Sequence, residues 1–286
     1  MKKSNYYVGI EISKLTFNVA ISSSEDNYKY FKFVNNHEGF AMFLEYLSAS
    51  DSICVMEANG PYYLKLATFL SEQAIDVCVI NPLVIRRFSQ MRMSRAKTDK
   101  KDAMLIAEYG KTEKPDLWRP EAAYALELKQ MQAYLEQLNK NRTVFTVQKE
   151  AFNQNPIKSE TLDKSINSVI ETIDQEIKQI EKCMELIIKT HHQEMFDQLR
   201  SIPGMGSKTS LFLIVISGGF SKFNNHKQLA SYIGISPRIF ESGTSVKGKS
   251  KICKMGMSKI RVLLYMCAWS AKRCNETCKA LYDRLL

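Results

Sequence analysis

The sequence lacks any run of about 18 consecutive apolar residues, the length that a membrane-spanning helix requires. Its first residues, MKKSNYYVGIEIS, are basic and then turn into a strand pattern, without the apolar core or the cleavage site of a secretion signal. These absences predict a protein that has no membrane span and works in the cytoplasm. The 286 residues, 45% of them hydrophobic, are enough for one large domain or two smaller ones.

Cysteine pairs of the kind that hold zinc or form disulfides are also lacking. The seven cysteines are odd in number and scattered along the chain. Cys54 and Cys78 lie in apolar, strand-like runs, where a buried free thiol is usual. Cys274 and Cys278 are separated by three residues and have no second ligand pair. The sequence therefore predicts neither a disulfide framework nor a zinc site.

Acidic residues are scarce beside basic ones, with 30 Asp and Glu against 40 Lys and Arg and a net charge of +10. The excess is clustered in RRFSQMRMSRAKTDKK (86–101) and from residue 236 onward, where only three acidic residues oppose many basic ones. Surface solubility needs no clustering, so we favour nucleic acid as an anionic partner. The residues expected to contact it are Arg86, Arg87, Arg92, Arg95, Lys97, Lys208, Arg238, Lys247, Lys249, Lys251 and Lys254.

Residues 1–119 alternate between strand and helix patterns. Three apolar, β-rich runs joined by short polar links predict an antiparallel meander, and two further strands then follow in βα crossovers. The predicted strands are 6–13, 17–23, 30–36, 52–58 and 76–82, and the predicted helices are 37–49, 61–73 and 100–110, the last closed by Gly110. This order predicts an α/β domain with a mixed five-stranded sheet, as in the ribonuclease H-like (RuvC-like) fold.

Two helical regions follow. Residues 120–195 carry apolar residues at three- and four-residue spacing, interrupted at Pro156, which predicts a long helical, coiled-coil linker. It would either space the domains or associate with another copy. Residues 196–286 predict a mostly α-helical domain, in which LRSIPGMGSKTSLFLIVISGG (199–219) suggests a helix-hairpin-helix. Its glycine turn would suit a phosphate oxygen, although such turns are also common for structural reasons alone.

Four carboxylates fall where a ribonuclease H-like fold carries its acidic residues. Glu11 lies within the first strand, Glu57 ends the fourth, and Asp99 and Asp102 share one face of the last helix. Clustered carboxylates repel one another unless a cation lies between them, and hard oxygen ligands suit Mg²⁺ or Mn²⁺. Taken singly, each has a structural alternative, such as helix N-cap for Asp99. Taken together, they predict a metal site for phosphoryl transfer.

The chain resembles the DEDD-type insertion-sequence transposases, the family of pilin-inverting and bridge-RNA-guided recombinases. The pieces that carry the resemblance occur in the family's order over nearly the whole chain. They are VGIEISK (8–14), MEANGPYY (56–63), AKTDKKDA (96–103), SIPGMGSKTS (201–210), LASYIGISPR (229–238) and SGTSVKGKSKICKMG (242–256).

The resemblance implies a RuvC-like domain, a coiled-coil linker and a C-terminal transposase domain that bears a catalytic serine. The acidic tetrad corresponds to Glu11, Glu57, Asp99 and Asp102, and the serine corresponds to Ser242. The family joins this serine covalently to DNA as a phosphoserine. A noncoding bridge RNA pairs with donor and target DNA, and the protein acts as a homo-oligomer, a dimer or a tetramer. Mg²⁺ or Mn²⁺ is the implied cofactor.

One residue departs from the family pattern, which has Asp where this chain has Glu11. The extra methylene shifts the carboxylate by about 1.5 Å, enough to alter metal geometry. Three alternatives stay open from the sequence alone. Thr244 or Ser245 could replace Ser242 as nucleophile. The chain could be a hydrolytic nuclease of the Holliday-junction type, or a nucleic-acid-binding protein with impaired catalysis.

Overall fold

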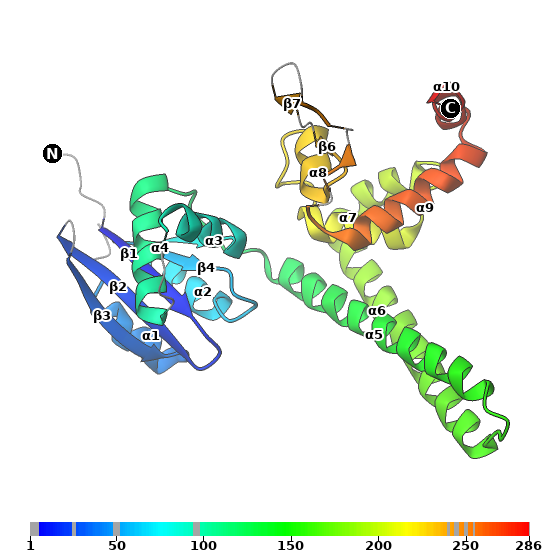
Figure 1. The fold of residues 1–286 in the computed structure, drawn as a ribbon, viewed down its shortest axis with the longest axis horizontal. Coiled ribbons are helices and arrows are strands. Elements are labelled where there is room, and N and C mark those ends of the chain that lie inside the picture. Colours follow the sequence, from blue (N-terminus) through cyan, green and yellow to red (C-terminus); the bar gives the residue numbers. More distant parts are fainter. Residues whose placement is uncertain are drawn as a thin grey trace. The chain divides into compact units, whose positions relative to one another are not determined.

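The structure is a computed structural model that describes residues 6–24, 27–47, 52–93, 98–238, 241–242, 246–248, 251–253 and 255–285. The chain divides into two compact units, Met1–Glu121 and Ala122–Leu286, each described here by itself (Figure 1). The division into 1–119, 120–195 and 196–286 stays a prediction. Within the described residues, no helix is both long enough and apolar enough to cross a membrane.

The first unit is built on a five-stranded mixed sheet with the order β3-β2-β1-β4-β5. Its strands are β1 (Tyr6–Ile12), β2 (Thr16–Ser24), β3 (Asn27–Val34), β4 (Ser52–Glu57) and β5 (Asp76–Ile80). The first three pair antiparallel, whereas β4 pairs parallel with both β1 and β5. The predicted mixed sheet of a meander followed by two crossover strands is confirmed.

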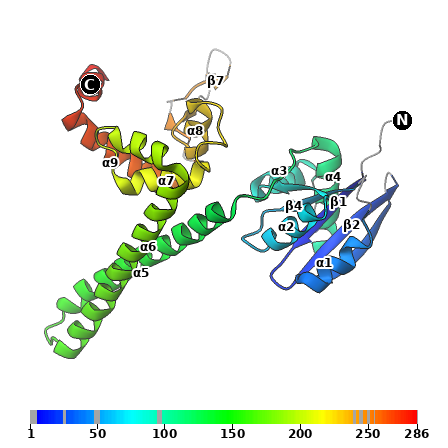
Figure 2. The same cartoon turned by 180° about the vertical axis from the view of Figure 1, so that it is seen from behind.

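Helices cover both faces of this sheet (Figures 1 and 2). On one face, α1 (His37–Leu44) and α2 (Leu64–Glu72) bury an apolar core that includes Phe17, Phe43 and Met56. On the other face, α3 (Pro82–Met91) and α4 (Asp99–Glu113) pack on a second cluster. Successive strand residues alternate between the two faces, so Val55 belongs to the α4 side and its neighbour Met56 to the α1 side.

Two predictions about this unit are wrong in detail. Helix α3 was not predicted, and β5 ends at Ile80 because the side chain of Asn81 accepts a hydrogen bond from the Leu83 N–H at 2.9 Å and starts a helix there. Gly110 does not end the last helix, which continues to Glu113. A Cβ on Gly110 would lie 2.6 Å from Val55 Cγ2, so glycine is present because the helix approaches the sheet closely.

Helix α4 approaches the sheet very closely at Gly9 in β1. A Cβ there would lie 2.0 Å from the carbonyl oxygen of Ala103 and 2.4 Å from the backbone nitrogen of Ala107, both in α4. These distances are far below van der Waals contact, so only glycine allows the two backbones to come this near. The side chains of Ala103 and Ala107 are themselves small and buried. The contact fixes α4 across β1.

The second unit begins with two long helices, α5 (Ala123–Asn153) and α6 (Glu160–Ser201), which run side by side (Figures 1 and 2). Leu128, Leu135 and Leu138 of α5 share one apolar cluster with Ile177 and Met184 of α6. The break expected at Pro156 falls in the turn between them. Two long helices are therefore confirmed, and a coiled-coil geometry stays a prediction.

The rest of this unit is mostly helical. After α6, a turn at residues 202–206 leads into α7, so the two predicted helices with a turn between them are confirmed, and the helix-hairpin-helix motif stays a prediction. Gly204 has φ +93° in this turn, and a Cβ there would lie 2.7 Å from the carbonyl oxygen of Cys267. The remaining elements are α7 (Ser207–Ser217), α8 (His226–Ile233), β6 (Pro237–Arg238), β7 (Glu241–Ser242), β8 (Val246–Lys247), β9 (Lys251–Ile252), α9 (Ser258–Cys274) and α10 (Glu276–Leu285). The four short strands and α10 were not predicted.

The first testable prediction concerns the contact between β1 and α4. We expect Gly9→Ala to destabilise the first unit by about 3 kcal/mol or more, because the added methyl meets backbone that cannot rotate away. Gly110→Ala should cost less, about 1 to 2 kcal/mol, because its methyl meets side-chain atoms, which can shift more easily than backbone, and alanine favours the helix.

Urea denaturation measures both variants through the fluorescence of Trp118, which packs on the core of the first unit. A Trp269→Phe background removes the only other tryptophan. Equal destabilisation by the two substitutions, or a larger loss for Gly110→Ala, would contradict the close backbone contact at Gly9.

Candidate functional site

Glu11 and Glu57 lie on neighbouring parallel strands. The register pairs Ile10 of β1 with Met56 of β4, and one further step along both strands brings Glu11 beside Glu57. Gly9 faces α4, and a residue two positions along a strand points to the same face. The same alternation from Val55 to Glu57 puts Glu57 on that face as well. Both strand carboxylates therefore project on the side that α4 covers.

Asp99 and Asp102 lie in the first turn of α4. The N-cap is Thr98, whose side chain accepts a hydrogen bond from the Lys101 N–H at 3.2 Å, so the alternative role of Asp99 as N-cap is wrong. Unpaired N–H groups give the start of a helix a partial positive charge, which stabilises carboxylates there. The helix thus tolerates two acidic residues, three positions apart, at its N-terminus.

Asn18 of β2 links the strand side of this site to the helix side. It stands opposite Glu11 in the antiparallel register of β1 and β2. Its amide Nδ2 donates a hydrogen bond to Asp99 Oδ2 at 3.3 Å. A direct contact therefore joins the start of α4 to the sheet position beside Glu11. We did not predict this residue, although asparagine is depleted inside strands and its presence there is a usable signal.

Tyr30 of β3 holds the same turn of α4 from a second direction. Its hydroxyl donates to the carbonyl oxygen of Lys100 at 2.9 Å, and the Lys100 ammonium lies 4.0 Å from the centre of its ring. Burial, and secondarily the neighbouring Tyr28, raise the pKa of Tyr30 to about 12. The hydroxyl accordingly keeps its proton at neutral pH and remains a donor. No pattern in the sequence predicts this contact.

The four carboxylates share one end of the sheet, but their side chains are not drawn together. Asp99 is exposed, whereas Glu11, Glu57 and Asp102 are half-buried. Across the described ranges, no group of three or more Asp, Glu, His or Cys side chains is arranged to hold a metal ion. The donors are all carboxylate oxygens, which fit Mg²⁺ or Mn²⁺ chemically. Metal binding by this tetrad stays a prediction.

Ser242 ends the short strand β7, where its backbone pairs with Val246 of β8. The two rival nucleophiles, Thr244 and Ser245, lie outside the described residues. The serine therefore stands at the edge of a two-stranded hairpin in a glycine- and lysine-rich segment. Its role as nucleophile stays a prediction.

The basic residues predicted to contact nucleic acid have varied surroundings. Arg86 and Arg87 are exposed on α3, and Arg238 and Lys251 are exposed on the paired strands β6 and β9. Lys247 lies in β8. The predictions for Arg95, Lys97, Lys249 and Lys254 fall outside the described residues.

Two of the predicted cations are engaged within the protein. Arg92 Nη2 lies 2.6 Å from Glu108 Oε1, and Lys208 Nζ lies 2.7 Å from Glu181 Oε1. Exposed ion pairs of this kind are weak and can be exchanged for phosphate contacts. The presence of a partner therefore does not decide between an internal role and nucleic-acid binding, which stays a prediction for both.

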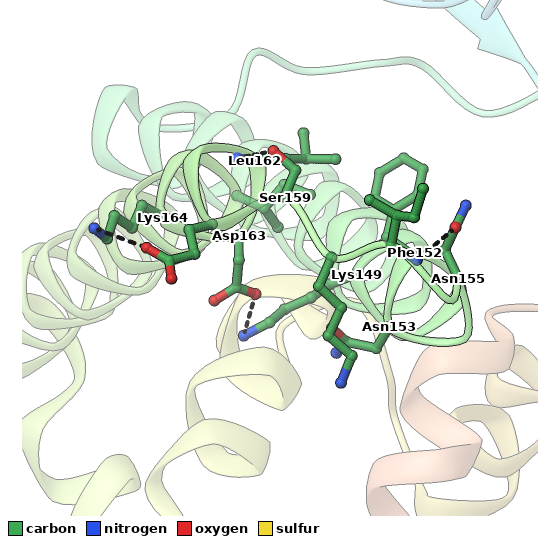
Figure 3. A pocket seen from close by; sticks show the side chains of 12 residues that line it. Lys149, Phe152, Asn153, Asn155, Ser159, Leu162, Asp163 and Lys164 are labelled. Atoms are coloured by element: carbon green, nitrogen blue, oxygen red, sulfur yellow. Dashed lines mark hydrogen bonds and ion pairs between the residues drawn. The ribbon is translucent and has the colours of Figure 1, made fainter.

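A pocket of about 510 Å³ lies at the turn between α5 and α6 (Figure 3). Lys149 reaches across it, with its Nζ 3.4 Å from Asp163 Oδ1 and 2.6 Å from the side-chain oxygen of Asn167. Lys164 Nζ lies 3.8 Å from Glu160 Oε2, so four of the five charged residues that line the pocket are paired with each other. We assign it no catalytic role.

The amino-acid sequence is similar to those of known protein families and of individual known proteins. Residues 8–152 match the transposase family designated DEDD_Tnp_IS110, and residues 197–283 match the transposase family IS116/IS110/IS902. The pilin gene-inverting proteins of Moraxella bovis and Moraxella lacunata are each 34% identical over 272 residues, covering 92% of this chain and 82% of theirs. An uncharacterized 43.6 kDa protein of insertion element IS110 from Streptomyces coelicolor is 25% identical over 120 residues, 42% of this chain and 29% of that protein.

The first family match contains all four carboxylates of the tetrad, and the second contains Ser242. Both matches and the two pilin gene-inverting relatives agree in kind, since each concerns the movement or inversion of DNA. The chain therefore belongs to the IS110 family of transposases, a family of DNA recombination enzymes.

Proposed function

We propose that this protein cuts and rejoins DNA strands by using two sets of residues. Glu11, Glu57, Asp99 and Asp102 would bind a divalent metal ion, and Ser242 would attack the scissile phosphate. The observation that carries the proposal is that the start of α4, with Asp99 and Asp102, lies at the end of the sheet that carries Glu11 and Glu57. The hydrogen bond from Asn18, opposite Glu11, to Asp99 joins the helix to that end of the sheet. Membership of a transposase family supports DNA as the substrate.

In each step of the proposed reaction, one phosphate ester bond forms as another breaks. Ser242 Oγ forms a bond to phosphorus as the bond from phosphorus to one sugar oxygen breaks, and the serine proton passes through solvent to that leaving oxygen. The hydroxyl of a second strand end then attacks the phosphoserine, releases Ser242 and joins the new strands. A metal ion on the carboxylates would stabilise the negative charge that develops on the phosphate. Exposed Arg238 and Lys251 would bind the DNA backbone near the serine segment.

The first unit would have the ribonuclease H-like fold of RuvC-type enzymes. Support comes from the strand order β3-β2-β1-β4-β5, in which β2 alone is antiparallel to both of its neighbours. Support also comes from the carboxylates on β1, on β4 and on the helix packed across them. In the second unit, α5 and α6 would form a coiled-coil arm through which copies of the chain assemble into a dimer or a tetramer. A noncoding bridge RNA would select donor and target DNA.

Glu11 would change metal preference without abolishing activity. Glutamate remains an oxygen ligand, but its longer side chain reaches further from β1 than the aspartate expected in the family. Mn²⁺ tolerates irregular coordination better than Mg²⁺, which demands a near-ideal octahedron. We therefore expect the native chain to work better with Mn²⁺ than with Mg²⁺.

The second testable prediction concerns the nucleophile. Purified protein incubated with labelled donor and target DNA, the element's RNA and Mn²⁺ should form a protein–DNA species that survives denaturing electrophoresis. Ser242→Ala should abolish this species, because alanine has no hydroxyl to form the phosphoester. Thr244→Ala and Ser245→Ala are the matched controls and should leave it intact.

Covalent product from Ser242→Ala would reject Ser242 as nucleophile. Cutting of branched DNA by Ser242→Ala, with no covalent species from the native chain, would identify a hydrolytic nuclease instead. Salt-sensitive binding without any cutting would identify a catalytically impaired binding protein, above all if Glu11→Asp restores cutting.

The third testable prediction concerns the carboxylates. Glu57→Gln and Asp102→Asn should each lower the rate of strand cleavage by at least about 100-fold, because each removes a charge that holds the metal near the phosphate. Glu72→Gln is the control, since Glu72 is exposed on α2 at the opposite face of the sheet. Glu11→Asp should raise the ratio of the Mg²⁺-supported rate to the Mn²⁺-supported rate. Unchanged rates in both amide variants would refute the metal role of the tetrad.

A further inference from the structure

Helix α9 carries a continuous stripe of exposed apolar and aromatic side chains. Val262, Tyr265, Met266 and Trp269 follow one another at three- and four-residue spacing, with exposed fractions of 61%, 65%, 57% and 43%. The spacing places all four on one face of the helix. Such a stripe on a helix surface is costly to leave in water and indicates a binding surface.

The rest of the second unit packs against other parts of α9. Ile260 is fully buried, and Leu263 and Leu264 pack in a cluster with Phe212 and Ile216 of α7. Further along the helix, Ala271 meets the turn at Gly204. The apolar stripe is therefore not needed for the packing of α9 on α7.

Two cations lie over the aromatic rings of this stripe. The Lys272 ammonium is 4.9 Å from the centre of the Trp269 ring and 3.5 Å from that of Tyr282 in α10, and the Arg273 guanidinium is 5.8 Å from Trp269. Neither cation forms a salt bridge with a carboxylate in the part of the chain that the structure describes. Tyr265 adds a second ring, nearly parallel to Trp269, with an angle of 19° between the ring planes.

We propose that this face of α9, defined by Tyr265, Trp269, Lys272 and Arg273, binds single-stranded nucleic acid. The two rings would stack on unpaired bases, and the two cations would bind the adjoining phosphates. The proposal rests on the proposed function only in that the protein handles nucleic acid, and it assigns to this face a strand that is not paired. Bases inside a duplex already stack on their neighbours and offer no free face to these rings.

Charge favours a polyanion over a second copy of this chain as the occupant. Two copies meeting on this face would bury two sets of Lys272 and Arg273 in one interface, without carboxylates on the stripe to offset their charge. The basic residues of α9 and α10 are Lys259, Arg261, Lys272, Arg273, Lys279 and Arg284, against Glu276 and Asp283. Phosphate groups of a single strand would neutralise this excess and release counterions.

The fourth testable prediction measures binding by the full chain through fluorescence anisotropy. The probes are labelled DNA and RNA single strands of about 12 nucleotides, together with the DNA duplex of the same sequence. Trp269→Ala should weaken binding of single strands about 5- to 100-fold, the loss expected for one stacked base, and change duplex binding less than twofold. Tyr265→Ala should act in the same direction, and Trp269→Phe should restore most of the affinity. The DNA and RNA arms establish which single strand binds more tightly.

Tyr134→Ala is the matched control, because Tyr134 is an exposed tyrosine on the long helix α5, 46% accessible and without a cation over its ring among the described residues. Circular dichroism and the melting temperature check that each variant is folded. Single-strand affinity that falls equally in Trp269→Ala and Tyr134→Ala, or in neither, would overturn the proposal. So would a lower oligomer mass of Trp269→Ala in light scattering with unchanged single-strand affinity, which would identify a contact between copies.

The assay reads binding without strand cleavage and can be run in Ser242→Ala. If Trp269→Ala leaves single-strand binding unchanged while the native chain still forms the covalent species, only the stacking surface is refuted. Loss of the covalent species with intact single-strand binding would refute only the proposed reaction.

Discussion

The contact between the backbone of β1 at Gly9 and the backbone of α4 sets the position of everything else in the candidate site. The helix can lie this close to the sheet only because Gly9 has no side chain, with Ala103 and Ala107 opposite it. Gly110 then allows the later part of the helix to follow the sheet past Val55. With the body of α4 fixed in this way, its first turn comes to the end of β1 and β4 where Glu11 and Glu57 lie. Asn18 and Tyr30 hold that turn in place.

Much of the first unit could be predicted because its signals are local. Apolar, β-rich runs identified the five strands, and the short polar links of the first three predicted the antiparallel meander that the register confirms. Helix α3 was missed because only Ile85 and Phe88 are buried, so its apolar stripe is narrow beside its basic residues. Gly110 was misinterpreted because a helix end and a close helix–sheet contact both favour glycine, and only the tertiary structure distinguishes them. The strands β6 to β9 are two residues long, too short for any periodicity.

The candidate site, too, could be predicted only where its residues leave a local signal in the sequence. The carboxylates could be predicted because they occupy recognisable positions on elements that the sequence defines. The contacts that hold them, from Asn18 to Asp99 and from Tyr30 to the Lys100 carbonyl, join residues far apart in the chain and leave no local pattern. Positive charge is equally ambiguous in sequence. Lys208 is paired with Glu181, whereas Lys272 lies over aromatic rings, yet both are simply lysines in a basic region.

We propose that the carboxylates of α4 and of the strands bind one metal ion together. Electron paramagnetic resonance of added Mn²⁺ tests this, because bound Mn²⁺ loses the sharp signal of the free ion. The native protein should remove Mn²⁺ from solution in a saturable way, and both Glu57→Gln on β4 and Asp102→Asn on α4 should abolish that binding. Glu72→Gln should bind as the native chain does. If Mn²⁺ binding survives in either Glu57→Gln or Asp102→Asn, the strand and helix carboxylates do not form one site and the account is wrong.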